Sequence, residues 1–381
     1  MRHLLSNSLI IVCATIITLT EVEPFLTRNA VSTMSTLQFE AIYQFGDSLS
    51  DTGNLVRESN RGDCSYARLP YGQTFFHRAT GRCSDGLLMV DFFAIYFHLP
   101  LLNPILEKGG DFRNGANFAV AGATALDTTT LASINITSTV TYSSLSTQIV
   151  WFRSLLSSFC PNSTDCERSL EKSLVLLGEI GGNDYNFAFS QGKTMEQVYA
   201  LVPQVVQTIK DTVIELIGLG VTNIVVPGNF PIGCVPLYLF QFETNDTSKY
   251  DELHCLKEYN EFSQFHNRRL VEAIQELQDQ YPNVAIAYAD YYSALTWVIS
   301  NSFALGFEDG PEKACCSAGD NPYNYDPSRS CGSPGVPVCS NPAKRVSWDG
   351  IHLTQEGYRY VARWLLGQFL PELARQRRVR D

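Results

Sequence analysis

The feature that most constrains the fold of this chain is the alternation of short apolar runs with longer amphipathic segments. Four short runs are apolar almost throughout, and each is followed by glycine, proline or aspartate. They span residues 41–45, 174–177, 224–226 and 284–289, and a shorter fifth run spans residues 118–120. Runs of this kind predict strands that are buried on both faces, as in a parallel sheet.

Amphipathic segments fill the intervals between these runs. Apolar residues recur at helical spacing in residues 88–97, 145–159, 195–217, 252–277 and 354–370. Strands that alternate with helices predict an α/β fold, a three-layer α/β/α sandwich around one parallel sheet. Because no linker-like break separates these units, we expect a single domain over residues 38–372, followed by a basic tail at residues 373–381.

The N-terminus has the pattern of a secretory signal peptide. A weakly basic start precedes an apolar run at residues 9–19, and Glu21, Glu23 and Pro24 end that run. The run is too short to cross a bilayer comfortably, so we expect a signal peptide over about residues 1–25. A membrane anchor is the alternative. No later segment approaches the apolar length of a membrane span, so stable membrane insertion is not expected.

Cysteines and glycosylation sequons agree with entry into the secretory pathway. The chain has 11 cysteines, and Cys13 lies in the apolar N-terminal run, so an even number remains for pairing. An even number after a signal peptide predicts disulfides. Zinc is the alternative, but the chain has no CxxC pair and no histidine at ligand spacing. Sequons for N-glycosylation begin at Asn135, Asn162 and Asn245.

The first segment with candidate chemistry covers residues 45–54, Phe-Gly-Asp-Ser-Leu-Ser-Asp-Thr-Gly-Asn, where a predicted strand ends. In a parallel α/β sheet, ligands bind beyond the carboxyl ends of the strands. Gly46 relieves crowding at the turn, so Ser48 can project into such a site as a nucleophile. The alternative is an ordinary turn with a capping serine. The G-x-S-x-G elbow of other α/β hydrolases is absent from the chain.

The second segment is Asp-Gly-Ile-His at residues 349–352, just before the last predicted helix. A serine nucleophile needs a base, and the base needs a carboxylate that orients it. A spacing of three residues within a turn can place Asp349 beside His352. Of the histidines after the signal segment, only His352 has a carboxylate at this spacing in a glycine-containing turn. The alternative is an Asp/His pair that serves only as a helix N-terminus.

Two further segments offer hydrogen-bond donors for an oxyanion. Residues 178–184 read Gly-Glu-Ile-Gly-Gly-Asn-Asp, in which Asn183 supplies a neutral amide. A dinucleotide loop is the alternative, but the glycine spacing differs from G-x-G-x-x-G. In residues 117–124, Gly122 has no side chain to obstruct its N–H, although close packing of small residues explains that segment equally well.

Together and in this order, the four segments resemble the plant GDSL esterase/lipase family of the SGNH hydrolases, over about residues 41–370. The resemblance implies a flavodoxin-like α/β/α sandwich that needs no metal or organic cofactor. It implies that Ser48 is the nucleophile, with Asp349 and His352 completing the triad. It also implies three oxyanion donors, the backbone N–H groups of Ser48 and Gly122 and the side chain of Asn183.

These observations favour a secreted serine esterase, extracellular or vacuolar, that hydrolyses a small-molecule ester. The favoured substrate is an acetyl or aryl ester of a plant metabolite. One alternative is an acyltransferase that uses the same triad to pass the acyl group to an alcohol. Another is a non-catalytic glycan-binding protein, against which the complete set of five site residues speaks. The formal net charge of −11 argues against nucleic acid and anionic membranes as partners.

Overall fold

Five parallel strands form one sheet in the order β2-β1-β3-β4-β5. The computed structural model describes residues 37–58, 64–138, 140–159 and 163–378, and the predicted signal segment lies outside them. The strands are β1 (Ala41–Gln44), β2 (Gly115–Asn117), β3 (Ser173–Leu176), β4 (Asn223–Pro227) and β5 (Ala285–Ala289). This order is the flavodoxin-like arrangement of doubly wound folds, so the predicted α/β fold class is confirmed.

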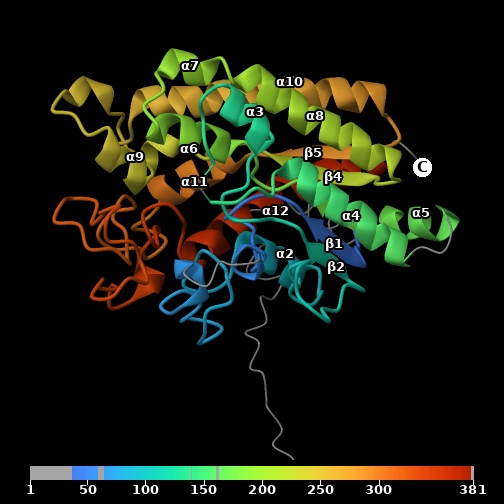
Figure 1. The fold of residues 1–381 in the computed structure, drawn as a ribbon, viewed down its shortest axis with the longest axis horizontal. Coiled ribbons are helices and arrows are strands. Elements are labelled where there is room, and N and C mark those ends of the chain that lie inside the picture. Colours follow the sequence, from blue (N-terminus) through green and yellow to red (C-terminus); the bar gives the residue numbers. More distant parts are fainter. Residues whose placement is uncertain (1–36, 59–63, 139, 160–162, 379–381) are drawn as a thin grey trace, which may run out of the picture.

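Helices cover both faces of the sheet, and Figure 1 shows the two outer layers. The helices are α2 (Met89–Tyr96), α3 (Thr128–Ser133), α4 (Leu145–Phe159), α5 (Ser163–Glu171), α6 (Gly182–Ser190), α7 (Met195–Tyr199), α8 (Val202–Gly218), α9 (Pro236–Gln241), α10 (Lys257–Gln280), α11 (Tyr291–Ser300) and α12 (Gln355–Arg378). Short 3-10 helices occur at Leu55–Arg57, Ser65–Ala67, Ile232–Cys234, Thr247–Lys249 and Pro342–Lys344. Within the described ranges, no helix has both the length and the apolar character needed to cross a membrane.

The alternation of side chains along each strand divides the core into two parts. In β1, Tyr43 packs with the helices α4, α8 and α10, whereas Ile42 packs with α2, α11 and α12 on the other face. Both side chains are buried, as are their equivalents in β3, β4 and β5. Burial of one such apolar side chain contributes about 1.5–3 kcal/mol. The need to fill both faces explains why these strands are apolar throughout.

The fifth predicted strand, at residues 118–120, is wrong in position. The strand is β2, three residues earlier, and its sequence Gly-Ala-Asn carries no β-strand signal. Gly115 lies so close to β1 that a Cβ atom there would stand 1.8 Å from the carbonyl oxygen of Ile42. The close approach of two backbones therefore selects small residues for this strand. Residues 118–120 continue beyond its end, with the N–H of Phe118 donating to the carbonyl of Gln44 at 2.7 Å.

Several predicted helices differ in extent from those in the structure, and the segment 252–277 corresponds to α10 at Lys257–Gln280. The segment 195–217 is divided into α7 and α8, because Pro203 lies in the first turn of α8, where its missing N–H costs nothing. The last helix extends to Arg378, well beyond residue 370. Residues 373–378 therefore belong to α12, where Leu373 and Ala374 are buried against the sheet-facing core.

The prediction of disulfides is confirmed, but not for every cysteine. Three disulfides join Cys234 to Cys255, Cys315 to Cys339 and Cys316 to Cys331, and Cys166 is disulfide-bonded as well. The expectation that all the remaining cysteines pair is wrong for Cys83, which is a thiol in this structure. The Cys83 thiol is fully buried and interacts with the hydroxyl of Tyr66.

Two of the disulfides fix the loop at residues 309–342 next to the candidate triad. Within this loop, the N–H of Cys315 donates to the carbonyl of Ser347 at 3.1 Å. The N–H of Cys316 donates to the carbonyl of Trp348 at 2.6 Å. Since Trp348 immediately precedes Asp349, the disulfide loop holds the backbone that leads into the second sequence motif.

Removal of the Cys316–Cys331 disulfide should lower the free energy of unfolding by about 3 kcal/mol, because it closes a loop with a sequence separation of 15. The test is urea unfolding of the double variant Cys316→Ser/Cys331→Ser under oxidising conditions. As a control, a reductant should destabilise the unaltered protein by at least as much. If the double variant is as stable as its parent, the prediction is wrong and this disulfide does not stabilise the fold.

Candidate active site

The candidate site lies where three loops leave neighbouring strands at the carboxyl edge of the sheet. One loop follows β1 and carries Ser48, the second follows β2 and carries Gly122, and the third follows β3 and leads to Asn183. Because β2, β1 and β3 are adjacent in the sheet, the three loops lie side by side. This is the edge at which ligands bind in open parallel sheets.

The loop that carries Ser48 begins at Gly46, whose backbone packs closely against Glu179 and forms two hydrogen bonds with Gln148. Gly46 has a φ of +131°, and a Cβ atom there would stand 3.0 Å from the carbonyl oxygen of Glu179. Gln148 on α4 accepts the N–H of Gly46 at 2.9 Å and donates to its carbonyl at 2.8 Å. The next residues turn sharply, with the N–H groups of Ser50 and Asp51 both donating to the carbonyl of Asp47. Ser48 lies within this turn and is half-buried.

The second loop is joined to the first through Asp51. One carboxylate oxygen of Asp51 accepts the N–H of Ala121 at 2.9 Å, which places Gly122 beside the Ser48 loop. Gly122 has a φ of +82°, and a Cβ atom there would stand 2.5 Å from side-chain carbons of Val140. Only glycine fits this position. Among the residues that the structure describes, no acceptor takes the backbone N–H of Ser48 or of Gly122.

Asn183 connects all three loops. It lies in the first turn of α6, and its side-chain nitrogen donates to Asp47 Oδ2 at 2.9 Å and to the carbonyl of Ala123 at 3.0 Å. Both amide protons are therefore in use. Donation to an oxyanion would require one of these hydrogen bonds to be shared or redirected.

Asp349 and His352 form the hydrogen-bonded pair that their spacing predicts. His352 Nδ1 lies 2.7 Å from Asp349 Oδ2, and both side chains are buried. Asp349 Oδ1 accepts the N–H groups of Ile351 and His352. Burial alone would raise the pKa of Asp349, but His352 and these hydrogen bonds outweigh it and lower the pKa below its ordinary value. Nε2 of His352 has no hydrogen-bond partner among the described residues.

The structure brings His352 near the Ser48 loop without a direct hydrogen bond between the two side chains. No described hydrogen bond joins Ser48 Oγ to His352 Nε2, although contacts of this kind often tighten only when substrate binds. Asp47, which immediately precedes Ser48, lies close enough to His352 for the two side chains to interact electrostatically. Burial raises the pKa of Asp47 to about 7, and the N–H of Leu49 and the charge of His352 oppose this rise.

A buried carboxyl that the sequence did not single out adjoins Asp47. Burial and the charge of Asp47 raise the pKa of Glu179 well above its ordinary value. Glu179 Oε2 has no hydrogen-bond partner among the described residues. Burial of the two interacting carboxyls therefore favours the protonated form of each.

Sequence reasoning also missed Tyr71. Its hydroxyl donates to Asp349 Oδ2 at 2.8 Å, on the same oxygen that faces His352. Its ring packs edge-on against Tyr66, which in turn lies edge-on to the ring of His352 with 5.9 Å between centroids. Only the stretch Pro-Tyr-Gly at residues 70–72 marks this position, and nothing in it indicates contact with a residue so distant in the chain.

The described residues contain no cluster of three or more histidine, cysteine, aspartate or glutamate side chains with the geometry to hold a metal ion. The site combines a buried Asp–His pair, a nearby serine and two backbone N–H groups without acceptors among the described residues, and acyl transfer needs groups of these kinds.

Comparison with known proteins agrees with this class of site. Residues 42–365 match the family model of the GDSL-like lipases and acylhydrolases. Acetylajmalan esterase 1 of Rauvolfia serpentina is 44% identical over 88% of this chain and 88% of its own length. Acetylajmalan esterase 2 of the same plant is 42% identical, over 92% and 95%. A GDSL esterase/lipase of Arabidopsis thaliana is 45% identical, over 86% and 82%.

The fold and the similar proteins define a carboxylic ester hydrolase with an SGNH-type parallel sheet. The chain belongs to the family of GDSL-like lipases and acylhydrolases.

Substitution of Tyr71 by phenylalanine should lower kcat for ester hydrolysis about 10–100-fold, since a hydrogen bond to a charged group is worth roughly 1.5–3 kcal/mol. KM and the unfolding midpoint should change little, because the ring keeps its packing against Tyr66 and Trp348. Steady-state kinetics and thermal unfolding of the variant give these quantities.

The matched control is Tyr66→Phe, which removes a neighbouring hydroxyl but leaves the hydrogen bond to Asp349 intact. Equal losses of kcat in the two variants would indicate a general disturbance of the aromatic cluster. An unchanged kcat in Tyr71→Phe would rule out a role for this hydroxyl in positioning Asp349.

Proposed function

We propose that this esterase cleaves a small carboxylic ester through an acyl-enzyme on Ser48. The observation that carries the proposal is the buried Asp349–His352 pair, in which Nδ1 is occupied by Asp349 and Nε2 has no described partner. A histidine held in this way is oriented as a base at one nitrogen only. Ser48, in the adjacent loop at the carboxyl edge of the sheet, is the nucleophile that this base would serve.

In the first step, Ser48 Oγ attacks the ester carbonyl carbon while His352 Nε2 takes the hydroxyl proton. Asp349 stabilises the imidazolium that forms and keeps its Nδ1 proton in place. The tetrahedral intermediate collapses, and the alcohol leaves with the proton that His352 returns. In the second step, water loses a proton to His352 and attacks the acyl carbon, so that the carboxylic acid and free Ser48 are released.

The negative charge of each tetrahedral intermediate needs donors that are already in place. The backbone N–H groups of Ser48 and Gly122 have no acceptor among the described residues, which supports their assignment. Asn183 is the third donor in this proposal, with one amide proton turning from Asp47 or Ala123 toward the oxyanion. Donors fixed in advance lower the barrier because they need no reorganisation during the reaction.

The proposed substrate is an acetyl or aryl ester of a small plant metabolite. Two similar proteins of Rauvolfia serpentina are named acetylajmalan esterases, which supports an acetyl ester in particular. The absence of a membrane-spanning helix among the described residues is also compatible with a small-molecule substrate.

The proposed location is the secretory pathway or beyond it. The disulfides support an oxidising compartment. Two of the three sequon asparagines, Asn135 and Asn245, are exposed and accessible to glycosylation. The third, Asn162, and the signal segment lie outside the described residues.

Substitution of Ser48 by alanine should lower kcat/KM by about 10³-fold or more and abolish labelling by a fluorophosphonate. The residual rate would come from substrate binding and the oxyanion donors. The matched control is Ser50→Ala, two residues away in the same turn, which should keep its labelling. Mass spectrometry of the labelled peptide identifies the modified serine, and a label on another serine would exclude Ser48 as the nucleophile.

Hydrolysis should dominate over transfer to an alcohol, because no element of the triad selects an acceptor other than water. The experiment supplies acetyl and aryl esters together with graded concentrations of a polyol or sugar acid. The free acid and any new ester are quantified by chromatography. If new ester exceeds free acid at millimolar acceptor, the protein excludes water in favour of an alcohol, and the acyltransferase alternative replaces the hydrolase.

A further inference from the structure

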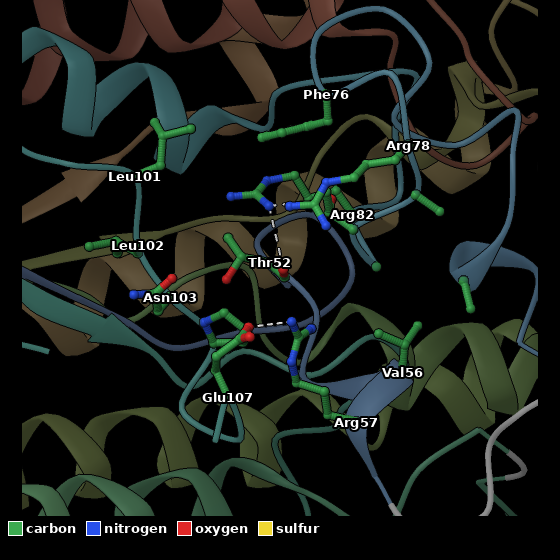
Figure 2. Close-up of a pocket in the computed structure, with 15 residues that line it drawn as sticks. Thr52, Val56, Arg57, Phe76, Arg78, Arg82, Leu101, Leu102, Asn103 and Glu107 are labelled. Atoms are coloured by element: carbon green, nitrogen blue, oxygen red, sulfur yellow. Dashed lines mark hydrogen bonds and ion pairs between the residues drawn. The ribbon is translucent and has the colours of Figure 1, made fainter. Parts of the chain in front are cut away.

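A cavity lies behind the Ser48 loop and includes none of the five candidate site residues. Its volume is about 520 Å³, within the range of small-molecule binding pockets, and Thr52, Arg57, Arg78 and Arg82 are among the residues that line it. Figure 2 shows the side chains of Arg78 and Arg82 extending toward the middle of this cavity. The ester chemistry proposed above uses none of these groups.

The charges around the cavity leave one arginine without a counter-ion. Arg57 forms an ion pair with Glu107 across the cavity wall. Arg82 forms a buried two-pronged pair with Asp91, at 2.7 and 2.8 Å. Arg78 is exposed and has no ion pair among the described residues. Counted over the described residues, the cavity therefore carries the excess charge of a single guanidinium group.

One further donor in the cavity is poorly satisfied. Thr52 lines the wall, but its hydroxyl oxygen is itself buried. The Nη1 atom of Arg82 makes only long contacts, 3.4 Å to the carbonyl of Thr52 and 3.3 Å to the hydroxyl of Thr80. A buried polar group that lacks a good partner has a free-energy cost that a ligand atom can remove.

Part of the wall is apolar. Val56, Phe76 and Leu101 line the cavity, and the guanidinium group of Arg82 lies 4.6 Å from the centre of the Phe76 ring. A planar guanidinium binds a carboxylate through two parallel hydrogen bonds. The single excess charge matches one carboxylate better than a multiply charged phosphate, and the apolar wall suits an organic body attached to it.

We propose that this cavity is a binding site for a small organic acid with one carboxylate and an aromatic or aliphatic body. Arg78 binds the carboxylate, Arg82 Nη1 donates to it, and Phe76 contacts the body. Since Thr52 lies four residues after Ser48, the occupied site adjoins the back of the loop that carries the candidate nucleophile.

The test is isothermal titration of benzoate into the full chain, after the active serine has been blocked with a fluorophosphonate. Blocking prevents benzoate in the catalytic pocket from being counted. We expect one saturable site per chain. Arg78→Gln should raise Kd at least about tenfold, and Arg78→Lys should raise it less, because lysine keeps the charge but loses the planar fork.

Two controls make the comparison specific. Arg268→Gln, which changes an exposed arginine on α10, should leave Kd unchanged. Benzamide, a neutral relative of benzoate, should show no saturable binding. Since Arg78 is exposed, its substitution should not disturb folding, and the unfolding midpoint of each variant checks this.

Equal affinity of Arg78→Gln and the parent for benzoate, or equal binding of benzamide, would overturn the proposal. Tighter binding of inorganic phosphate than of benzoate would overturn the assignment to an organic acid. If Ser48 does not react with the fluorophosphonate, the result contradicts the proposed catalytic role of Ser48 and leaves the cavity proposal to be tested. Even then, the comparison between the parent and Arg78→Gln decides whether the cavity binds the acid.

Discussion

The arrangement of the candidate site depends on one buried carboxylate, that of Asp51. Its two oxygens accept N–H groups from three residues of its own loop and from Ala121 in the next loop. Burial raises the pKa of this carboxyl, and the four donors oppose that rise by stabilising the charged form. Because Ala121 precedes Gly122, this single group fixes one candidate oxyanion donor relative to Ser48. Asn183 extends the same network to the third loop through Asp47.

Asp349 and His352 reach this network from the far end of the chain and are held by different means. Their turn is anchored through the disulfide loop, which is hydrogen-bonded to Ser347 and Trp348. Tyr71 then fixes the carboxylate from a segment near the other end of the chain. Three separate parts of the chain therefore hold Asp349 or the backbone just before it. A base that is to face one nucleophile needs to be held in one orientation in this way.

The Ser48 loop is also held from its opposite side, where the cavity lined by Arg78 and Arg82 lies. Arg57 donates to the carbonyl of Gly53 at 2.7 Å, and Arg82 makes a longer contact with the carbonyl of Thr52. Each of these arginines is itself fixed by a carboxylate. The loop is thus bounded by the candidate active site on one side and by a cationic cavity on the other. A change in the hydrogen bonds of Thr52 acts on the same short turn that positions Ser48.

The sequence by itself determined four of the five strands, the extent of α4 at residues 145–159, and the Asp349–His352 pair. These features follow from local periodicity or from a spacing of three residues, which a single segment contains in full. The tertiary structure alone decided the position of β2, because Gly-Ala-Asn becomes a strand only through the close approach of Gly115 to Ile42. It alone brought Tyr71 to Asp349 and Gln148 to Gly46, across 278 and 102 residues of chain. Such contacts carry no local signal, since they arise from the order in which the parallel strands pack and not from the residues that flank them.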